Sequence, residues 1–254
     1  MPLVVQLRSA VCLLGRFPAL AGVDLDVAEG EVVLLSGANG AGKTTLLRLV
    51  AGLAPLHSGT ATVLGHDLAE DREGARPAIG LFGHQTFCYD DLTVRENLRF
   101  AARSVRKPVE AADTALERVG LQAQAGVEHA RLSAGQRRRL ALAVALAREP
   151  RLLLLDEPHA GLDAEGRAVL DAVVRTAPAD GRTVLLASHE LDIGRALAGR
   201  EAVVAGGRVV RGGVLATSDS VPRTEKEGAG ARGACGGRCG WWRARTCASR
   251  RGRA

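Results

Sequence analysis

The chain has few aromatic residues and no long hydrophobic run. Phe, Trp and Tyr make up 3% of its 254 residues, so a folded core must be built from Ala, Val and Leu. The longest apolar run, Leu140 to Ala147, is far shorter than the roughly 20 residues that a membrane-spanning helix needs. We therefore expect a cytoplasmic protein with enough chain to bury one α/β core.

Most of the chain has no excess of charge of either sign. Residues 1–217 contain 25 basic and 25 acidic residues, whereas residues 218–254 contain 9 and 3, so the whole net charge of +6 lies at the C-terminal end. A nucleic-acid-binding domain carries a basic face on the folded domain itself. We therefore expect no nucleic-acid partner.

The composition changes near Thr217. Residues 218–254 are dominated by Gly, Arg, Ala, Cys and Trp, and their hydrophobic periodicity is lost. Such a segment cannot form a packed core, which predicts a disordered basic tail. A shifted reading frame is a second explanation, because these residues have GC-rich codons. The tail holds three cysteines without a nearby fourth metal ligand: Cys235, Cys239 and Cys247.

Short apolar runs alternate with helical patterns in residues 1–217. The runs expected to be buried strands are Val32 to Leu35, Leu152 to Leu155, Val184 to Ala187 and Val203 to Ala205. The helical patterns cover Lys43 to Gly52, Arg137 to Arg148 and Ala164 to Thr176. This alternation predicts an α/β fold with a mainly parallel sheet.

Two regions depart from that alternation. Between Leu92 and Arg131 the pattern is helical throughout, most clearly over Val94 to Ser104 and Ala111 to Val119. We interpret about residues 86–140 as a helical subdomain inserted into the α/β core. Residues 7–27 contain alternating Val, Asp and Leu, which favours antiparallel strands beside the core.

A glycine-rich sequence follows the first of the buried strands. Gly37-Ala-Asn-Gly-Ala-Gly-Lys43-Thr44-Thr45 matches the phosphate-binding pattern G-x-x-x-x-G-K-[ST], with a strand before it and a helix after it. Glycines let backbone N–H groups surround phosphate oxygens, and the helix N-terminus attracts the same anion. Lys43 can reach the phosphates and Thr44 can ligate Mg²⁺. The predicted ATP contacts are Gly37, Asn39, Gly40, Ala41, Gly42, Lys43, Thr44 and Thr45.

Two carboxylates end the strand of four leucines. Asp156 lies where a hard cation such as Mg²⁺ could be held through oxygen ligands. Glu157 is then placed to orient and polarise an attacking water, because phosphoryl transfer depends mainly on positioning and charge stabilisation. Alone, the pair could be a solvated strand end, but the phosphate loop upstream favours a catalytic role.

The sequence Leu132-Ser133-Ala134-Gly135-Gln136 opens a helix. Ser-x-x-Gln is a capping box, so a purely structural role explains it. Its order relative to the phosphate loop, the Asp156-Glu157 pair and the later His189 nevertheless resembles the ABC ATPases over about residues 3–213. In that reading it is the family's signature sequence.

The resemblance implies a P-loop NTPase core and a split site in a head-to-tail dimer. One subunit holds ATP and Mg²⁺, and the signature of the other contacts the γ-phosphate through Ser133, Gly135 and Gln136. Asp163 would lie in the D-loop at the dimer seam, and His189 would be the switch histidine. A separate membrane permease would be the second partner, with this chain on the inner face of the membrane.

Two positions depart from the pattern of the family. The family's Q-loop glutamine corresponds to His84, with Gln85 one residue later; Gln85 is favoured as a Mg²⁺ or water ligand because an amide both donates and accepts. Adenine stacks on an aromatic residue in many relatives, but the register gives Leu14 here, and Phe17 is the nearest substitute. Arg137, Arg138 and Arg139 are expected to form a solvated helix face.

Within the family, two short segments resemble the ATP-binding subunits of heme exporters of cytochrome c maturation. They are Gly83-His84-Gln85 and the signature with Ala134 in place of the commoner Gly. The expected function is ATP hydrolysis that powers heme export through a permease. The alternatives are the ATPase of a drug or lipid exporter and, outside transport, a soluble ABC protein of DNA repair or translation. The repair class needs long coiled coils, and only about 90 residues separate Lys43 from Ser133.

Overall fold

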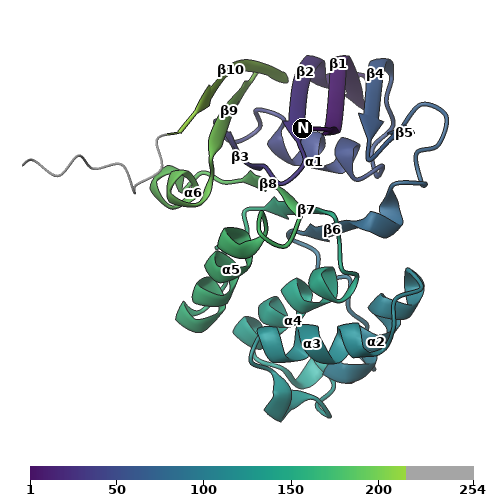
Figure 1. Ribbon diagram of the computed structural model, residues 1–254, viewed down its shortest axis with the longest axis vertical. Helices are drawn as coiled ribbons and strands as arrows, with labels where there is room; N and C mark the ends of the chain where they lie inside the picture. The colour runs from purple at the N-terminus through teal and green to yellow at the C-terminus, as the bar shows by residue number, and fades with distance from the viewer. Residues whose placement is uncertain (216–254) are drawn as a thin grey trace, which may run out of the picture. The chain divides into compact units, whose positions relative to one another are not determined.

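The computed structural model describes residues 1–215, which lie in one compact unit that contains two β-sheets. The predicted disorder of residues 218–254 concerns positions outside the described residues. The six-stranded sheet has the order β10-β9-β3-β8-β7-β6, and the four-stranded sheet has the order β2-β1-β4-β5 (Figure 1). All neighbours in the larger sheet are parallel except β9 and β10. The predicted α/β fold with a mainly parallel sheet and an antiparallel flank is confirmed.

The two longest strands, β1 and β2, lie in the smaller sheet, which also contains the shortest, β5. The smaller sheet contains β1 (Leu3–Leu14), β2 (Phe17–Ala28), β4 (Ser58–Val63) and β5 (His66–Asp67). The larger sheet contains β3 (Val32–Ser36), β6 (Ile79–Phe82), β7 (Leu152–Asp156), β8 (Thr183–Ala187), β9 (Arg200–Ala205) and β10 (Arg208–Val214).

Within residues 1–215, six α-helices accompany the sheets. They are α1 (Lys43–Val50), α2 (Val94–Ser104), α3 (Glu110–Arg118), α4 (Ala134–Ala147), α5 (Ala164–Thr176) and α6 (Leu191–Leu197). Figure 1 shows α2, α3 and α4 gathered on the side of β6 and β7, away from the four-stranded sheet. Helix α1 lies on the other side of the larger sheet, between it and β1.

The central strands of the larger sheet, β3, β7 and β8, are buried on both faces, which explains their apolar sequences. In β7, Leu153 and Leu155 pack into a core shared with α2, α3, α4 and α5. Leu152 and Leu154 point to the opposite face and join a core formed with α1 and the four-stranded sheet. The carboxyl ends of β3, β7 and β8 are thus fixed by packing from two sides, and the candidate site residues follow these ends.

The region from 92 to 131 is less uniformly helical than predicted. Helix α3 ends at Arg118, and Gly120, at φ +66°, adopts a backbone conformation that favours glycine. Short 3₁₀ turns follow at Gln122–Gln124 and His129–Arg131. Between these two turns, Glu128 forms an isolated β-bridge with Thr93, the residue that precedes α2.

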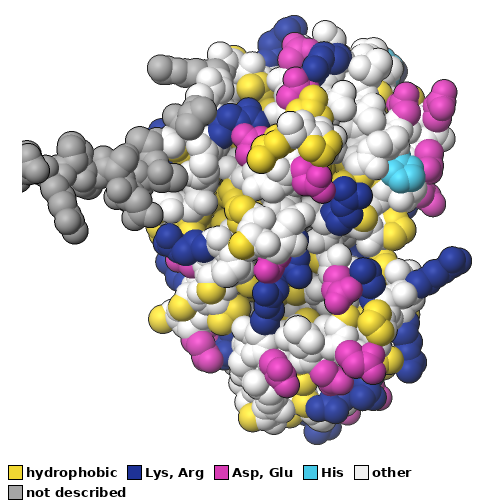
Figure 2. Space-filling model, viewed as in Figure 1, with side chains coloured by type: hydrophobic (Ala, Val, Ile, Leu, Met, Phe, Trp, Pro, Cys, Tyr) yellow, Lys and Arg dark blue, Asp and Glu magenta, His cyan; other side chains and the backbone are white. Residues whose placement is uncertain are grey.

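Surface charge is mixed on the face shown in Figure 2, where basic and acidic side chains are interspersed. This agrees with the equal numbers of acidic and basic residues counted over positions 1–217. Within residues 1–215, no helix has both the length and the apolar character needed to cross a bilayer.

Candidate nucleotide site

The phosphate loop has a backbone that only glycine allows at two positions. Gly37 has φ +143°, and a Cβ there would lie 2.1 Å from the carbonyl oxygen of Val204. Gly42, with φ +111°, leads into α1, and a Cβ would lie 2.8 Å from the carbonyl oxygen of Ala19. The loop is therefore enclosed by β9 and β2, and its conformation is built into the core.

Lys43 begins α1 and is 7% exposed. Its ammonium donates hydrogen bonds to the carbonyl oxygens of Gly37 at 2.7 Å and of Ala38 at 3.2 Å. The cation thus lies inside the curve of the loop. This is where a phosphate would meet both the ammonium and the N-terminus of α1.

Thr44 and Asp156 are 112 residues apart in sequence and meet at the site. The Thr44 hydroxyl donates to Oδ1 of Asp156 at 3.1 Å. This pair of oxygen groups suits Mg²⁺, which typically binds through one or two carboxylates together with substrate phosphates. Among residues 1–215, no group of three or more His, Cys, Asp or Glu side chains could hold a metal by itself. A cation here would need phosphate oxygens to complete its coordination.

Glu157 and His189 also meet. Nδ1 of His189 lies 2.6 Å from Oε2 of Glu157, and the backbone N–H of His189 donates to the same oxygen at 3.3 Å. Glu157 has φ +48°, a left-handed conformation that is rare for a residue with a side chain. Its carboxylate is 27% exposed and the imidazole is 59% exposed. Both groups are therefore accessible to a water molecule and to a phosphate.

The other residues predicted to bind ATP or Mg²⁺ near the phosphate loop line two adjacent hollows. A hollow of about 610 Å³ is lined by Thr44, His84, Gln85, Asp156 and Glu157, among others. A smaller one of about 270 Å³ contains Asn39, Gly40, Ala41, Thr45, Leu14 and Glu157, among others. His84 and Gln85 both face the first hollow, so the choice between them stays open. Leu14 lies by the phosphate loop, whereas Phe17 is 80% exposed and lines neither of these hollows.

The residues of the signature form a second, separate group. Ser133 caps α4 by accepting from the N–H of Gln136 at 3.2 Å, and Gln136 accepts from the N–H of Ser133 at 2.9 Å. A Cβ on Gly135 would lie 3.0 Å from Oδ2 of Asp163, so these two are neighbours. None of the four lines either hollow beside the phosphate loop. The capping box, Ser133 to Gln136, thus forms the last four residues of the predicted signature.

The arginine run that follows the signature is not a solvated face, contrary to the prediction. Arg137 is exposed, but Arg139 is 8% exposed and pairs with Glu165 at 2.8 Å and Asp163 at 3.5 Å. Arg138 is half-buried over the ring of Phe82, with Cζ 4.2 Å from the ring centroid. Sequence alone missed both because the acceptors lie in distant segments.

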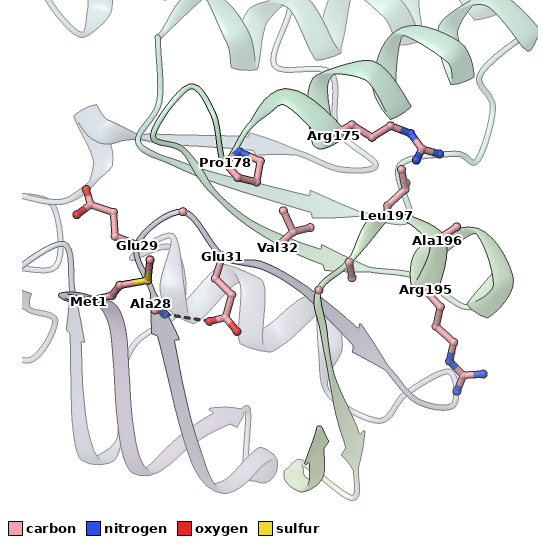
Figure 3. A pocket seen from close by; sticks show the side chains of 13 residues that line it. Met1, Ala28, Glu29, Glu31, Val32, Arg175, Pro178, Arg195, Ala196 and Leu197 are labelled. Carbon is pink, nitrogen blue, oxygen red and sulfur yellow. Dashed lines mark hydrogen bonds between the residues drawn. The ribbon is translucent and has the colours of Figure 1, made fainter. Parts of the chain in front are cut away.

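A hollow of about 820 Å³ lies at the opposite end of the larger sheet, at the amino end of β3 (Figure 3). Glu31 in its wall accepts from the N–H of Ala28 at 3.0 Å and pairs with Arg200. Open α/β sheets bind their ligands at the carboxyl ends of the strands. The candidate catalytic and phosphate-binding residues lie at the carboxyl ends of the strands, beside the two smaller hollows, and not at this larger one.

Comparison with known proteins identifies the family. The family model described as ABC transporter matches residues 20–160. The human phospholipid-transporting ATPase ABCA7 is 38% identical over 199 residues, which are 76% of this chain but 9% of that protein. The cytochrome c biogenesis ATP-binding export protein CcmA of Bordetella bronchiseptica is 42% identical over 187 residues, 72% of this chain and 83% of that protein.

A solved structure extends the likeness to the fold. The dimeric, post-hydrolysis state of the ATP-binding cassette MJ0796, bound to ADP and Pi, superposes with a TM-score of 0.76 at 25% identity. The match covers 84% of this chain and 99% of that one. The chain spans only a small part of ABCA7 but most of CcmA and of the cassette. It belongs to the ABC transporter family and carries the ATP-binding domain of that family.

Proposed function

We propose that this chain binds ATP with Mg²⁺ and hydrolyses it to ADP and phosphate. The observation that carries the proposal is the convergence of Thr44 with Asp156 and of Glu157 with His189 beside the phosphate loop. The loop amides, Lys43 and the N-terminus of α1 would hold the phosphates. Bound Mg²⁺ would neutralise phosphate charge, with Thr44, Asp156 and Gln85 as its protein ligands.

In this mechanism Glu157 accepts a hydrogen bond from the attacking water and polarises it. His189 holds the Glu157 carboxylate in place through the 2.6 Å contact. As the switch histidine it would also contact the γ-phosphate. Proximity and orientation supply most of the acceleration, because phosphoryl transfer needs little covalent help from the protein.

The complete site would need two copies of the domain. Ser133, Gly135, Gln136 and Asp163 lie together but line neither hollow beside the phosphate loop of the same chain. A head-to-tail dimer would bring this group of one subunit to the ATP held by the other. The cassette MJ0796, whose structure is dimeric, supports the formation of a dimer. Binding of γ-phosphate by both helix N-termini would favour the closed dimer, and hydrolysis would release it.

We propose that the dimer powers a membrane permease that exports heme for cytochrome c maturation. The 42% identity to CcmA over 83% of that protein supports this cargo. His84 and Ala134, which resemble the corresponding segments of heme exporters, support it too. Phe87 and Tyr89, at 52% and 54% exposure, and the neighbouring Leu92 would contact the permease, with the chain at the cytoplasmic face of the membrane.

The second candidate is an exporter of lipids or drugs. The similarity to ABCA7 supports the lipid alternative. The two are separated by reconstituting the chain with the permease encoded beside its gene. Stimulation of ATP hydrolysis by heme and not by phospholipid would support heme export. Stimulation by phospholipid and not by heme would rule out heme export in favour of lipid export.

The core proposal is tested with Glu157→Gln. The amide keeps the size of the side chain but cannot polarise water as a carboxylate does, so ATP binding should persist while turnover falls at least about 100-fold. The ATP-bound dimer should then persist in size-exclusion chromatography with Mg²⁺. Glu70→Gln, a change at an exposed residue, is the control and should behave as wild type. Normal steady-state hydrolysis by the Glu157 variant would remove Glu157 from its role.

A further inference from the structure

One guanidinium on α4 connects two segments that carry candidate catalytic groups, the segment of Phe82 to Gln85 and the segment that begins at Glu157. From the second turn of α4, Nε of Arg138 donates to the carbonyl oxygen of Ala160 at 3.1 Å, and Nη2 donates to that of Glu157 at 3.4 Å. Nη1 donates to the carbonyl oxygen of Gly83. The same group stacks on Phe82.

Each of these partners has a defined place in the site. Phe82 ends β6, and Gly83 directly precedes His84 and Gln85. The Glu157 carbonyl belongs to the residue whose carboxylate contacts His189. Ala160 lies in the loop that leads to Asp163. Arg138 therefore contacts only backbone and an aromatic ring here, and it acts on the chemistry through the residues that it holds.

The backbone of Glu157 needs such support. A non-glycine residue at φ +48° is strained and persists only where its surroundings fix it. The N–H of Glu157 donates to the carbonyl oxygen of Ala187 at 2.9 Å, and Arg138 binds its carbonyl on the other side. These two hydrogen bonds hold the peptide groups on both sides of the strained residue.

We propose that Arg138 is a positioning residue for Glu157, resting on the proposed function in ATP hydrolysis. It keeps the Glu157 backbone in its left-handed conformation and so aims the carboxylate at His189 and the attacking water. Because α4 begins at the Ser133 cap, the same side chain makes the position of Glu157 depend on the position of the signature helix.

The chemistry of arginine suits this task and that of other residues does not. A planar guanidinium offers five N–H donors in a fixed fork and can stack on a ring while bonding in its own plane. A lysine ammonium is a compact charge that reaches fewer of these carbonyls at once. A glutamine amide has two N–H donors and no charge. Burial lowers the pKa of Arg138, a cost opposed by the nearby Asp156.

The test compares Arg138→Gln and Arg138→Lys with wild type. We expect kcat for ATP hydrolysis to fall about 10- to 100-fold in Arg138→Gln, because a small displacement of a reacting group has effects of that size. KM and the Kd for a fluorescent ATP analogue should stay within about twofold, since Arg138 touches no phosphate-loop residue. Arg138→Lys should remain well below wild type in kcat and provides the test if the glutamine variant does not fold.

Arg148→Gln is the matched control. Arg148 follows the other end of α4, its pKa is also lowered by burial, and it donates to the carbonyl oxygens of Ile79 and Arg76 at 3.2 and 2.9 Å. Its variant should lower the unfolding temperature but keep kcat. Hydrolysis by Arg138→Gln within twofold of wild type, full activity in Arg138→Lys, or an equal loss of kcat in Arg148→Gln would overturn the inference. Failure of the wild-type chain to bind or hydrolyse ATP would overturn the proposed function itself.

Discussion

Lys43 is the residue on which nucleotide affinity should depend most directly. Its ammonium is enclosed by the loop and donates to two loop carbonyls. Removing it deletes a charge-assisted contact to phosphate, so Lys43→Ala should weaken ATP binding by about 10-fold or more. Titration with a fluorescent ATP analogue measures this. Lys107→Ala removes an exposed ion pair with Glu149 and should bind normally; equal affinity in both variants would contradict the phosphate-loop assignment.

Single residues also mark where prediction from sequence succeeds. The phosphate loop could be found because its chemistry is local: glycines, a lysine and a threonine at fixed spacing. Thr44 and Asp156 could be assigned to one place because both side chains suit the same Mg²⁺. The environment of Arg138 and Arg139 could not, because a run of arginines has the same appearance whether its acceptors are water or backbone carbonyls 19 to 55 residues away.

Among the helices, α4 poses the clearest question, because its capping box and its signature share Ser133. The two roles separate in Ser133→Asp. Aspartate is a good N-cap, so the free energy of unfolding should change by less than about 0.5 kcal/mol. Its negative charge would repel the γ-phosphate across the dimer seam, so ATP-dependent dimerisation should be lost. Chemical denaturation and size-exclusion chromatography measure the two effects.

Ser133→Ala provides the opposite case for that helix. It removes the cap at a cost of about 1 kcal/mol and leaves no charge to repel phosphate. If the Ser133→Asp variant dimerises at the same ATP concentration as the protein with Ser133, then Ser133 has a capping role only.

Elements with a strong period were predictable, and those held by tertiary contacts were not. Helices α2 and α5 have the predicted bounds, Val94–Ser104 and Ala164–Thr176. Strand β6 has four residues, one of them glycine, and its register is set by pairing with β7. Helix α6 has seven residues and no side-chain cap. Such short segments carry too little pattern to identify alone.

At the scale of the whole compact unit, the two sheets are linked by one charged cluster. Arg200 of β9 pairs with Glu31 at the entrance to β3, with Nη2 and Oε2 3.0 Å apart, and donates to the carbonyl oxygen of Asp26 in β2 at 2.6 Å. Burial raises the pKa of Glu31, but hydrogen bonds from Arg200 and the Ala28 N–H outweigh it and hold the pKa below its usual 4.5.

This link should make stability depend on pH in a defined direction. Because the folded state lowers the pKa of Glu31, the pair contributes stability above about pH 4.5 and loses it as the pH falls through the folded value. Glu31→Gln should therefore lower the free energy of unfolding by about 1 kcal/mol at pH 7 and by less at pH 3.5. In the control Glu70→Gln, the free energy of unfolding should change between pH 7 and pH 3.5 by as much as it does in the wild-type protein. An equal loss from Glu31→Gln at both pH values would mean that the side chain stabilises the junction of the sheets by packing, without its charge.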